Sequence, residues 1–193
     1  MPYPRGHRDR MRKRIVESAR RLFNRRGFEG VSIDEIMAGA KLTRGAFYSY
    51  FRSKSDLYAE VLGCFFTDPE WKSRWKGVKV DLRSENAGPQ IVRAYLSRQH
   101  FDDVANSCPM VALPSDVART DAKVKSAFEA VFRAMVAILE REVRDRRKAE
   151  ARAMSIAALC VGGMVVARAM NDGGFGDRLR RAATRTALEL GGW

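Results

Sequence analysis

Residues 43–54, TRGAFYSYFRSK, combine side chains that are well suited to binding a polyanion. Arg44 carries a planar guanidinium that can donate two parallel hydrogen bonds to paired acceptors such as guanine O6 and N7. Gly45 and Ala46 add little bulk, and the Ala46 methyl can contact the methyl group of thymine. Further donors of the kind that bind phosphate oxygens follow at Tyr48, Tyr50 and Lys54. The segment therefore has the chemistry of a nucleic-acid contact.

The net charge of the chain is concentrated around this segment. The 193 residues include 36 Lys and Arg against 23 Asp and Glu, a formal net charge of +13. Residues 1–54 hold 14 of these cations and 5 of the anions, so +9 of the +13 is N-terminal. Such a balance favours nucleic acid or an anionic membrane as the partner, and it places that contact in the N-terminal quarter.

Catalytic and metal-binding chemistry has little support in the sequence. The histidines are His7 and His100, and the cysteines at 64, 108 and 160 form no CxxC pair. An HExxH motif, a phosphate-binding loop and a Cys/His metal cluster are absent from the sequence. We therefore expect no metal, no cofactor and no enzymatic activity. An enzyme that uses His100 and Cys108 is kept as a further hypothesis.

The sequence shows neither a signal peptide nor a membrane-spanning segment, which favours a cytoplasmic protein with reduced cysteines. The basic N-terminus is not followed by the apolar segment of a signal peptide. The longest uncharged run, 153–167, is 15 residues long, whereas a membrane-spanning helix needs about 20. We expect a buried helix there and no membrane partner.

The elements that position residues 43–54 are predicted to be four helices. Ile15, Ala19, Leu22 and Phe23 form one apolar stripe of a helix over 8–26, which ends at Gly27. A second helix is predicted over 33–39, and it begins at a Ser32–Glu35 capping box. The third and fourth are predicted over 43–51 and 53–66, with Thr43 and Ser53 as their N-caps. The middle two helices are short and joined by three or four residues, which is typical of a helix-turn-helix. Within the second of them, Phe47 and Phe51 are spaced to face the core.

The rest of the chain is also predicted to be helical, so the fold class is all-α. Residues 67–88 read as a connecting region, and further helices are predicted over 89–104, 121–144, 147–170 and 175–190. A shorter helical segment is expected over 109–119, interrupted by Pro114. No alternating strand pattern competes with these helices.

Residues 12–57 resemble the DNA-binding domain of the TetR family of bacterial transcriptional regulators. The resemblance rests on Ile15, Ala19, Leu22-Phe23, Gly27-Phe28, Ser32-Ile33, Ile36, Gly45, Phe47-Tyr48, Phe51, Lys54 and Leu57. It implies a three-helix DNA-binding domain over 1–54, with a basic arm over 1–7, and a larger helical domain over 55–193. It also implies DNA contacts at Ser32, Lys41, Thr43, Arg44, Gly45, Ala46, Tyr48, Tyr50 and Lys54. Lys41 departs from the family's turn glycine, and Tyr50 replaces a frequent histidine.

The resemblance further implies a homodimer that binds a palindromic operator and a small-molecule effector. The last two long helices are expected at the dimer interface, through Ala157, Ala158, Gly162, Met164, Val165 and Leu179; an intramolecular core helix is the alternative. Candidate effector contacts are Trp71, Tyr95, His100, Phe101, Cys108, Met110, Phe128 and Phe132, each of which also suits an ordinary core.

The sequence therefore predicts a ligand-responsive, dimeric transcriptional regulator, more specifically a repressor. The alternative is a basic helical protein that binds RNA or anionic membrane without sequence-specific DNA reading. A membrane-surface helix needs an apolar face free for lipid, whereas Ile15, Leu22 and Phe23 are needed for the three-helix core.

Overall fold

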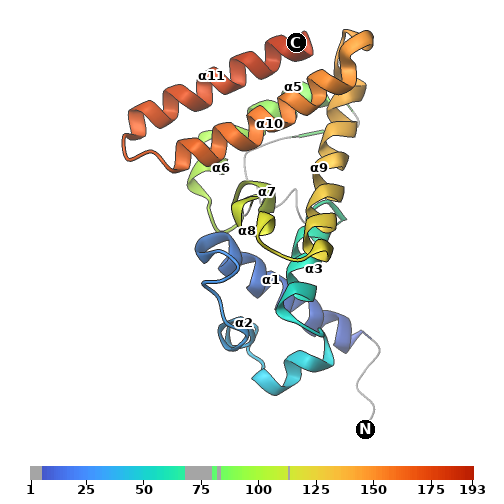
Figure 1. The fold of residues 1–193 in the computed structure, drawn as a ribbon, viewed down its shortest axis with the longest axis vertical. Coiled ribbons are helices and arrows are strands. Elements are labelled where there is room, and N and C mark those ends of the chain that lie inside the picture. The colour runs from blue at the N-terminus through green and yellow to red at the C-terminus, as the bar shows by residue number, and fades with distance from the viewer. Residues whose placement is uncertain (1–5, 68–79, 82–83, 113) are drawn as a thin grey trace. The chain divides into compact units, whose positions relative to one another are not determined.

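The computed structural model describes residues 6–67, 80–81, 84–112 and 114–193, and its regular elements over these ranges are all helices (Figure 1). The predicted all-α fold class is confirmed. The chain divides into two compact units. Unit 1 comprises residues 1–68 and 108–129, and unit 2 comprises residues 69–107 and 130–193.

Unit 1 begins with two helices that the sequence predicted closely. α1 (His7–Arg26) buries Ile15 and Phe23 completely and ends at Gly27, whose φ of 74° suits a residue without a Cβ. α2 (Ile33–Gly39) begins at the expected capping box. There the Glu35 backbone N–H donates to Ser32 Oγ at 3.2 Å, and the Ser32 N–H donates to Glu35 Oε2 at 2.9 Å.

The next element differs from the prediction in its helix type. The predicted helix 43–51 is a 3₁₀ helix, η1 (Arg44–Ser49), and Thr43 makes no side-chain cap. A segment this short gains few i→i+4 hydrogen bonds, so the tighter 3₁₀ turn competes well. α3 (Lys54–Thr67) follows, and its start is capped by a hydrogen bond of 3.0 Å from the Asp56 N–H to Ser53 Oγ.

The core of unit 1 also contains residues from much later in the chain. These residues belong to α8 (Pro114–Ala118) and the beginning of α9 (Ala122–Glu142), and α7 (Pro109–Ala112) packs against α1 and α3. Val117 of α8 and Val124 of α9 are buried in the same cluster as Phe23, Phe47 and Tyr58. The DNA-binding segment therefore shares its core with residues 117 and 124.

Unit 2 is built around two long helices that lie side by side (Figure 1). They are α10 (Ala149–Arg168), preceded by the 3₁₀ turn η2 (Arg146–Lys148), and α11 (Gly173–Gly191). Gly163 permits their close approach, because a Cβ there would lie 2.8 Å from the Ala183 Cβ. α5 (Ala87–Tyr95), α6 (Arg98–Asp102) and the later part of α9 complete the unit.

Three predicted helices are divided in the structure. The segment expected over 109–119 is α7 followed by α8. The helix expected over 89–104 is α5 followed by α6, because the Ser97 side chain accepts a hydrogen bond from the His100 N–H and starts a new helix. The helix expected over 147–170 is η2 followed by α10. Most of the predicted connecting region lies outside the described residues, and α5 already begins at Ala87.

Candidate nucleic-acid interface

The face of η1 that the sequence predicted as a DNA-reading edge is exposed. Thr43, Arg44, Gly45 and Tyr48 are exposed, and Tyr48 has 61% of its surface accessible to solvent. Phe47 beneath them is completely buried. A Cβ added at Gly45 would meet no atom within 4 Å, so nothing inside the protein requires a glycine there. The absence of a side chain at Gly45 leaves room for another molecule to approach the backbone of η1 closely.

The turn before η1 is held in an unusual backbone conformation at Lys41. Its φ is +54°, and it is the one non-glycine residue with positive φ among the described residues. The turn is closed by hydrogen bonds from the Lys41 N–H to Ala38 O at 2.9 Å and from the Leu42 N–H to Met37 O at 2.9 Å. The resemblance marks Lys41 as a departure from a turn glycine, and its positive φ is a conformation that glycine adopts without strain.

Arg44 forms an ion pair with Asp34 of α2. The Arg44 Nη1 lies 2.6 Å from Asp34 Oδ2, and more than half of each side chain is exposed. Exposed pairs of this kind are weak, so a guanine that offers two acceptors can compete for the guanidinium. In the DNA-free protein the pair places the Arg44 guanidinium at the edge of η1.

Lys54 is occupied differently from the sequence prediction. Its Nζ donates to Phe28 O at 2.8 Å and to Val31 O at 3.0 Å, and it lies 4.2 Å from the centre of the Phe28 ring. The ammonium therefore ties the loop between α1 and α2 to the start of α3. An ammonium has three N–H donors, so one remains for a phosphate.

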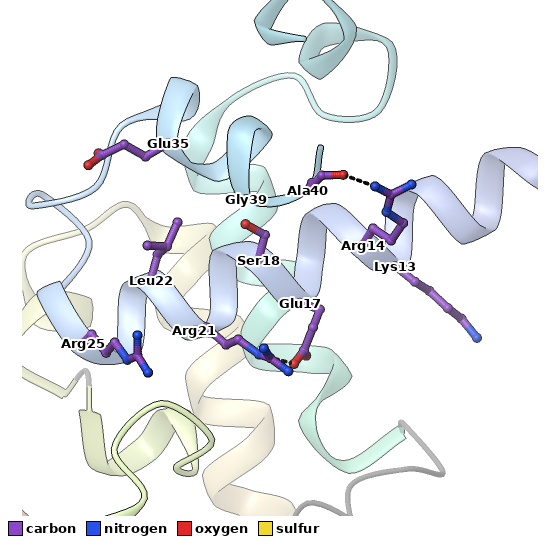
Figure 2. Close-up of a pocket in the computed structure, with 10 residues that line it drawn as sticks. All are labelled: Lys13, Arg14, Glu17, Ser18, Arg21, Leu22, Arg25, Glu35, Gly39 and Ala40. Atoms are coloured by element: carbon purple, nitrogen blue, oxygen red, sulfur yellow. Dashed lines mark hydrogen bonds and ion pairs between the residues drawn. The ribbon is translucent and has the colours of Figure 1, made fainter. Parts of the chain in front are cut away.

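Three arginines of α1 donate to backbone carbonyls of the helix-turn-helix. Arg14 donates to Ala40 O at 2.5 Å, at the end of α2 (Figure 2). Arg8 donates to Ser49 O at 2.8 Å, and Arg12 donates to Tyr50 O at 2.6 Å, both at the end of η1. The concentration of positive charge in residues 1–54 predicted polyanion binding as a whole and gave no indication of this internal role. The sequence feature that could have indicated this role is the position of all three arginines on one predicted helix.

A groove of about 580 Å³ runs between α1 and α2 (Figure 2). Its charged lining residues are Lys13, Arg14, Glu17, Arg21, Arg25 and Glu35. Glu17 pairs with Arg20 and Arg21, and Glu35 pairs with Arg26. None of the predicted DNA contacts lines this groove, which separates it from the exposed face of η1.

The predicted effector contacts are distributed over both units. Tyr95, His100, Phe101 and Phe132 belong to unit 2, whereas Cys108, Met110 and Phe128 belong to unit 1; Trp71 lies outside the described residues. His100 is buried, and its Nδ1 lies 2.6 Å from Tyr95 O. Burial lowers the pKa of His100 to about 4, so the ring is neutral near pH 7. The effector contacts remain predictions.

The predicted dimer contacts differ in their accessibility. Ala157 and Met164 were expected at the interface, but both are completely buried within the subunit, so they are not accessible to a second subunit. Ala158 is exposed, and Gly162, Val165 and Leu179 are half-buried. A Cβ at Gly162 would meet nothing within 4 Å. These four residues stay candidates for contact with a second subunit.

A metal site has no support within the described residues. No group of three or more His, Cys, Asp or Glu side chains gathers there in a way that could hold an ion. Cys64, Cys108 and Cys160 form no disulfide, and burial raises the pKa of the Cys160 thiol to about 12.

A helix-turn-helix whose second helix exposes Arg44 and Tyr48, directly after the exposed Thr43, has the geometry of a DNA-binding domain. Residues 15–61 match the family described as bacterial regulatory proteins, tetR family. The DNA-binding domain belongs to the TetR family, and the chain has the fold of that family's regulators. Proteins of this family are DNA-binding regulators rather than enzymes.

Two curated relatives match a part of the chain. The repressor DhaR of Mycobacterium sp. (strain GP1) is 36% identical over 58 residues, which cover 30% of this chain and 29% of that protein. The regulator AcrR of Shigella flexneri is 44% identical over 50 residues, covering 26% of this chain and 23% of that protein. The chain thus matches less than a third of the length of either relative.

Solved structures match nearly the whole chain. The reduced form of Escherichia coli NemR has a TM-score of 0.72 at 19% identity and covers 93% of this chain and 96% of that one. A TetR-family regulator from Agrobacterium tumefaciens has a TM-score of 0.64 at 23% identity, with coverages of 95% and 98%. These likenesses establish the fold across both units.

Proposed function

We propose that the protein is a dimeric transcriptional repressor that binds a palindromic DNA operator and is released by a small-molecule effector. The observation that carries the DNA-binding part is the exposed face of η1, from Thr43 to Tyr48, above the buried Phe47. The relatives DhaR and NemR are named transcriptional repressors, which favours repression over activation. Effector binding is typical of the family. Residues 1–54 then read DNA, and residues 55–193 serve dimerisation and effector binding in a cytoplasmic protein.

The proposed DNA contacts divide into reading and positioning groups. Base reading falls to Thr43, Arg44, Gly45 and Ala46, because these residues form the leading edge of η1. Phosphate contacts fall to Ser32, Lys41, Tyr48, Tyr50 and Lys54. Arg44→Ala should relax the preference at one base pair by about 1–3 kcal/mol, since a bidentate contact discriminates by that amount.

Membrane binding through α1 is the weaker alternative. Ile15, Ala19 and Phe23, which a lipid-binding face would need, are completely buried in unit 1. The segment Arg146–Arg168 is long and apolar enough to cross a membrane by composition, and 33% of its most apolar window is buried. We assign its exposed part to a second subunit instead.

The dimer proposal rests on the uncovered face of α10. Met154 and Val166 expose 44% and 45% of their surface, although both are large and apolar. Ala151, Ser155 and Ala158 are also exposed and lie on the same face, three or four residues apart. A partner helix can approach small residues closely, and two subunits are needed to read a palindrome.

Two experiments test the proposal. DNA duplexes selected by the purified protein from a random pool should share a palindrome, and their affinity should fall steeply with salt. Selection of RNA or tighter binding to anionic vesicles would contradict the DNA assignment. Ala158→Arg should shift the protein from dimer to monomer in sedimentation, whereas Ala137→Arg, at an exposed position of α9, should not. A monomeric wild-type protein would contradict the dimer.

A further inference from the structure

The side chain of Arg12 connects α1, the end of η1 and α3 within unit 1. Its Nη1 donates to Tyr50 O at 2.6 Å, directly after η1. Its Nε donates to Glu60 Oε1 at 2.9 Å, and its Nη2 donates to Glu60 Oε2, so Glu60 of α3 is bound in a bidentate pair. The guanidinium carbon also lies 4.3 Å from the centre of the Phe51 ring.

These contacts fix the guanidinium in position and direction. The bidentate pair with Glu60 sets the plane of the fork, because two parallel hydrogen bonds leave it little rotation. With the fork fixed, one of the Nη1 hydrogens points at the Tyr50 carbonyl. Arg12 and Glu60 are half-buried, with side-chain exposures of 39% and 24%, so solvent screens this pair less than a fully exposed one.

The carbonyl end of η1 needs such a partner. The last carbonyl oxygens of a helix receive no hydrogen bond from an N–H of the same helix. A cation near them also interacts favourably with the helix dipole. Arg8 donates to Ser49 O at 2.8 Å, one residue before the Arg12 contact. A six-residue 3₁₀ helix has few internal hydrogen bonds to hold its own orientation.

We propose that Arg12 is a positioning residue for DNA reading, which sets the orientation of η1 by linking its carbonyl end to Glu60 of α3. Arg12 makes no base contact in this assignment. It acts through Tyr50 and Phe51 on the face that Thr43, Arg44 and Tyr48 present. The inference rests on the proposed function, because the reading face has a role only if the protein binds a specific sequence.

The test compares Arg12→Gln with the matched control Arg10→Gln. Both variants remove one positive charge from α1, and Arg10 is exposed. Affinities are measured for the palindrome selected by the wild-type protein and for a scrambled duplex. Both variants should lower the affinity for the scrambled duplex to the same extent. Arg12→Gln should additionally lower the ratio of specific to non-specific affinity by about tenfold, equivalent to the loss of one well-made charged hydrogen bond.

Hydrogen exchange gives a readout that needs no operator. In the DNA-free protein, Arg12→Gln should speed exchange of the amides of residues 46–51, and Arg10→Gln should leave them unchanged. Glu60→Gln should give a similar increase, and the double variant Arg12→Gln/Glu60→Gln should exceed it little, because the two residues act through one contact. If Arg12→Gln fails to fold, Arg12→Lys, which keeps the charge without the fork, takes its place.

The outcomes separate the inference from the proposed function. Faster exchange in residues 46–51 without any selected palindrome would support the positioning of η1 and refute operator binding. Unchanged exchange together with an unchanged affinity ratio would overturn the role of Arg12 while operator binding stands. A loss of stability with an unchanged affinity ratio would make Arg12 structural only, which also overturns the inference.

Discussion

The carboxylate of Asp116 accepts a hydrogen bond from the backbone N–H of Phe28 at 2.9 Å. Asp116 is in α8, and Phe28 is in the loop between α1 and α2, so the contact joins segments far apart in the sequence. The carboxylate also lies against Gly27, where a Cβ would be 2.5 Å from Oδ2. The loop that starts the helix-turn-helix is therefore held by α8.

This relationship predicts that the DNA-binding unit depends on residues beyond α3 for its stability. Val124 of α9 is completely buried in the unit 1 core. Val124→Ala should lower the free energy of unfolding by about 1–3 kcal/mol, because it removes buried methyl groups and leaves a cavity. Urea unfolding of the whole chain measures this loss. Lys125→Ala at the exposed neighbouring position is the control, and equal stability of the two variants would contradict the shared core.

Lys41 should be a site where glycine stabilises the protein. Its φ of +54° is unfavourable for a residue with a Cβ, whereas glycine adopts it freely. Lys41→Gly should therefore raise the free energy of unfolding by roughly 0.5–1 kcal/mol, after the added chain entropy is offset. Lys41→Ala removes the same charge without relieving the conformation and should show no gain. Chemical denaturation of both variants distinguishes relief of strain from loss of charge.

The sequence predicted the N-terminal part of the fold well because its signals are local. The Ser32–Glu35 capping box and the Gly27 stop each depend on residues within a few positions, and both occur as expected. The contact of Asp116 with Phe28 depends on tertiary structure and has no local signal. The same holds for Arg12 and Glu60, whose pairing requires α1 and α3 to be packed together.

The candidate site was predicted more fully at its exposed face than in its support. Arg44 and Tyr48 are exposed, as a reading edge requires, and their spacing along one short helix was visible in the sequence. The sequence predicts a phosphate contact for Lys54, whereas in the structure its ammonium donates to the carbonyls of Phe28 and Val31. A lysine side chain is long enough to reach several acceptors, so the sequence alone does not select among them.

Lys54 should consequently contribute to stability as well as to DNA binding. Lys54→Met keeps the aliphatic chain but leaves the carbonyls of Phe28 and Val31 without their donor. We expect a loss of about 1–2 kcal/mol in the free energy of unfolding, the usual cost of unmade partly buried hydrogen bonds. Arg52→Met removes the same charge from an exposed position and is the matched control. Thermal unfolding should separate them, while both variants weaken all DNA sequences alike.

Glu35 should contribute to the loss of stability in acid. Hydrogen bonds from Arg26 and from Ser32 lower the pKa of Glu35 to about 2, from 4.5. Because the pKa is depressed in the folded state, its stabilisation is present above pH 4.5 and is lost as the pH falls towards 2. Glu35→Gln can keep the capping oxygen but does not titrate. Denaturant unfolding across this range should fall less steeply for Glu35→Gln than for the wild type, and Glu29→Gln, at an exposed loop position, should follow the wild type.

Gly45 should tolerate a side chain in the free protein but not on the operator. A Cβ at this position meets no atom within 4 Å, and its φ is not positive, so Gly45→Ala should fold with equal or slightly higher stability. If η1 approaches base edges at Gly45, the added methyl must displace DNA, and specific affinity should fall by about tenfold or more. Binding to a scrambled duplex, which needs no close approach, should change little. Ser49→Ala, at another exposed position of η1, controls for general effects on the helix. Unchanged operator affinity in Gly45→Ala would remove this residue from the reading edge and move the contact towards Thr43 and Arg44.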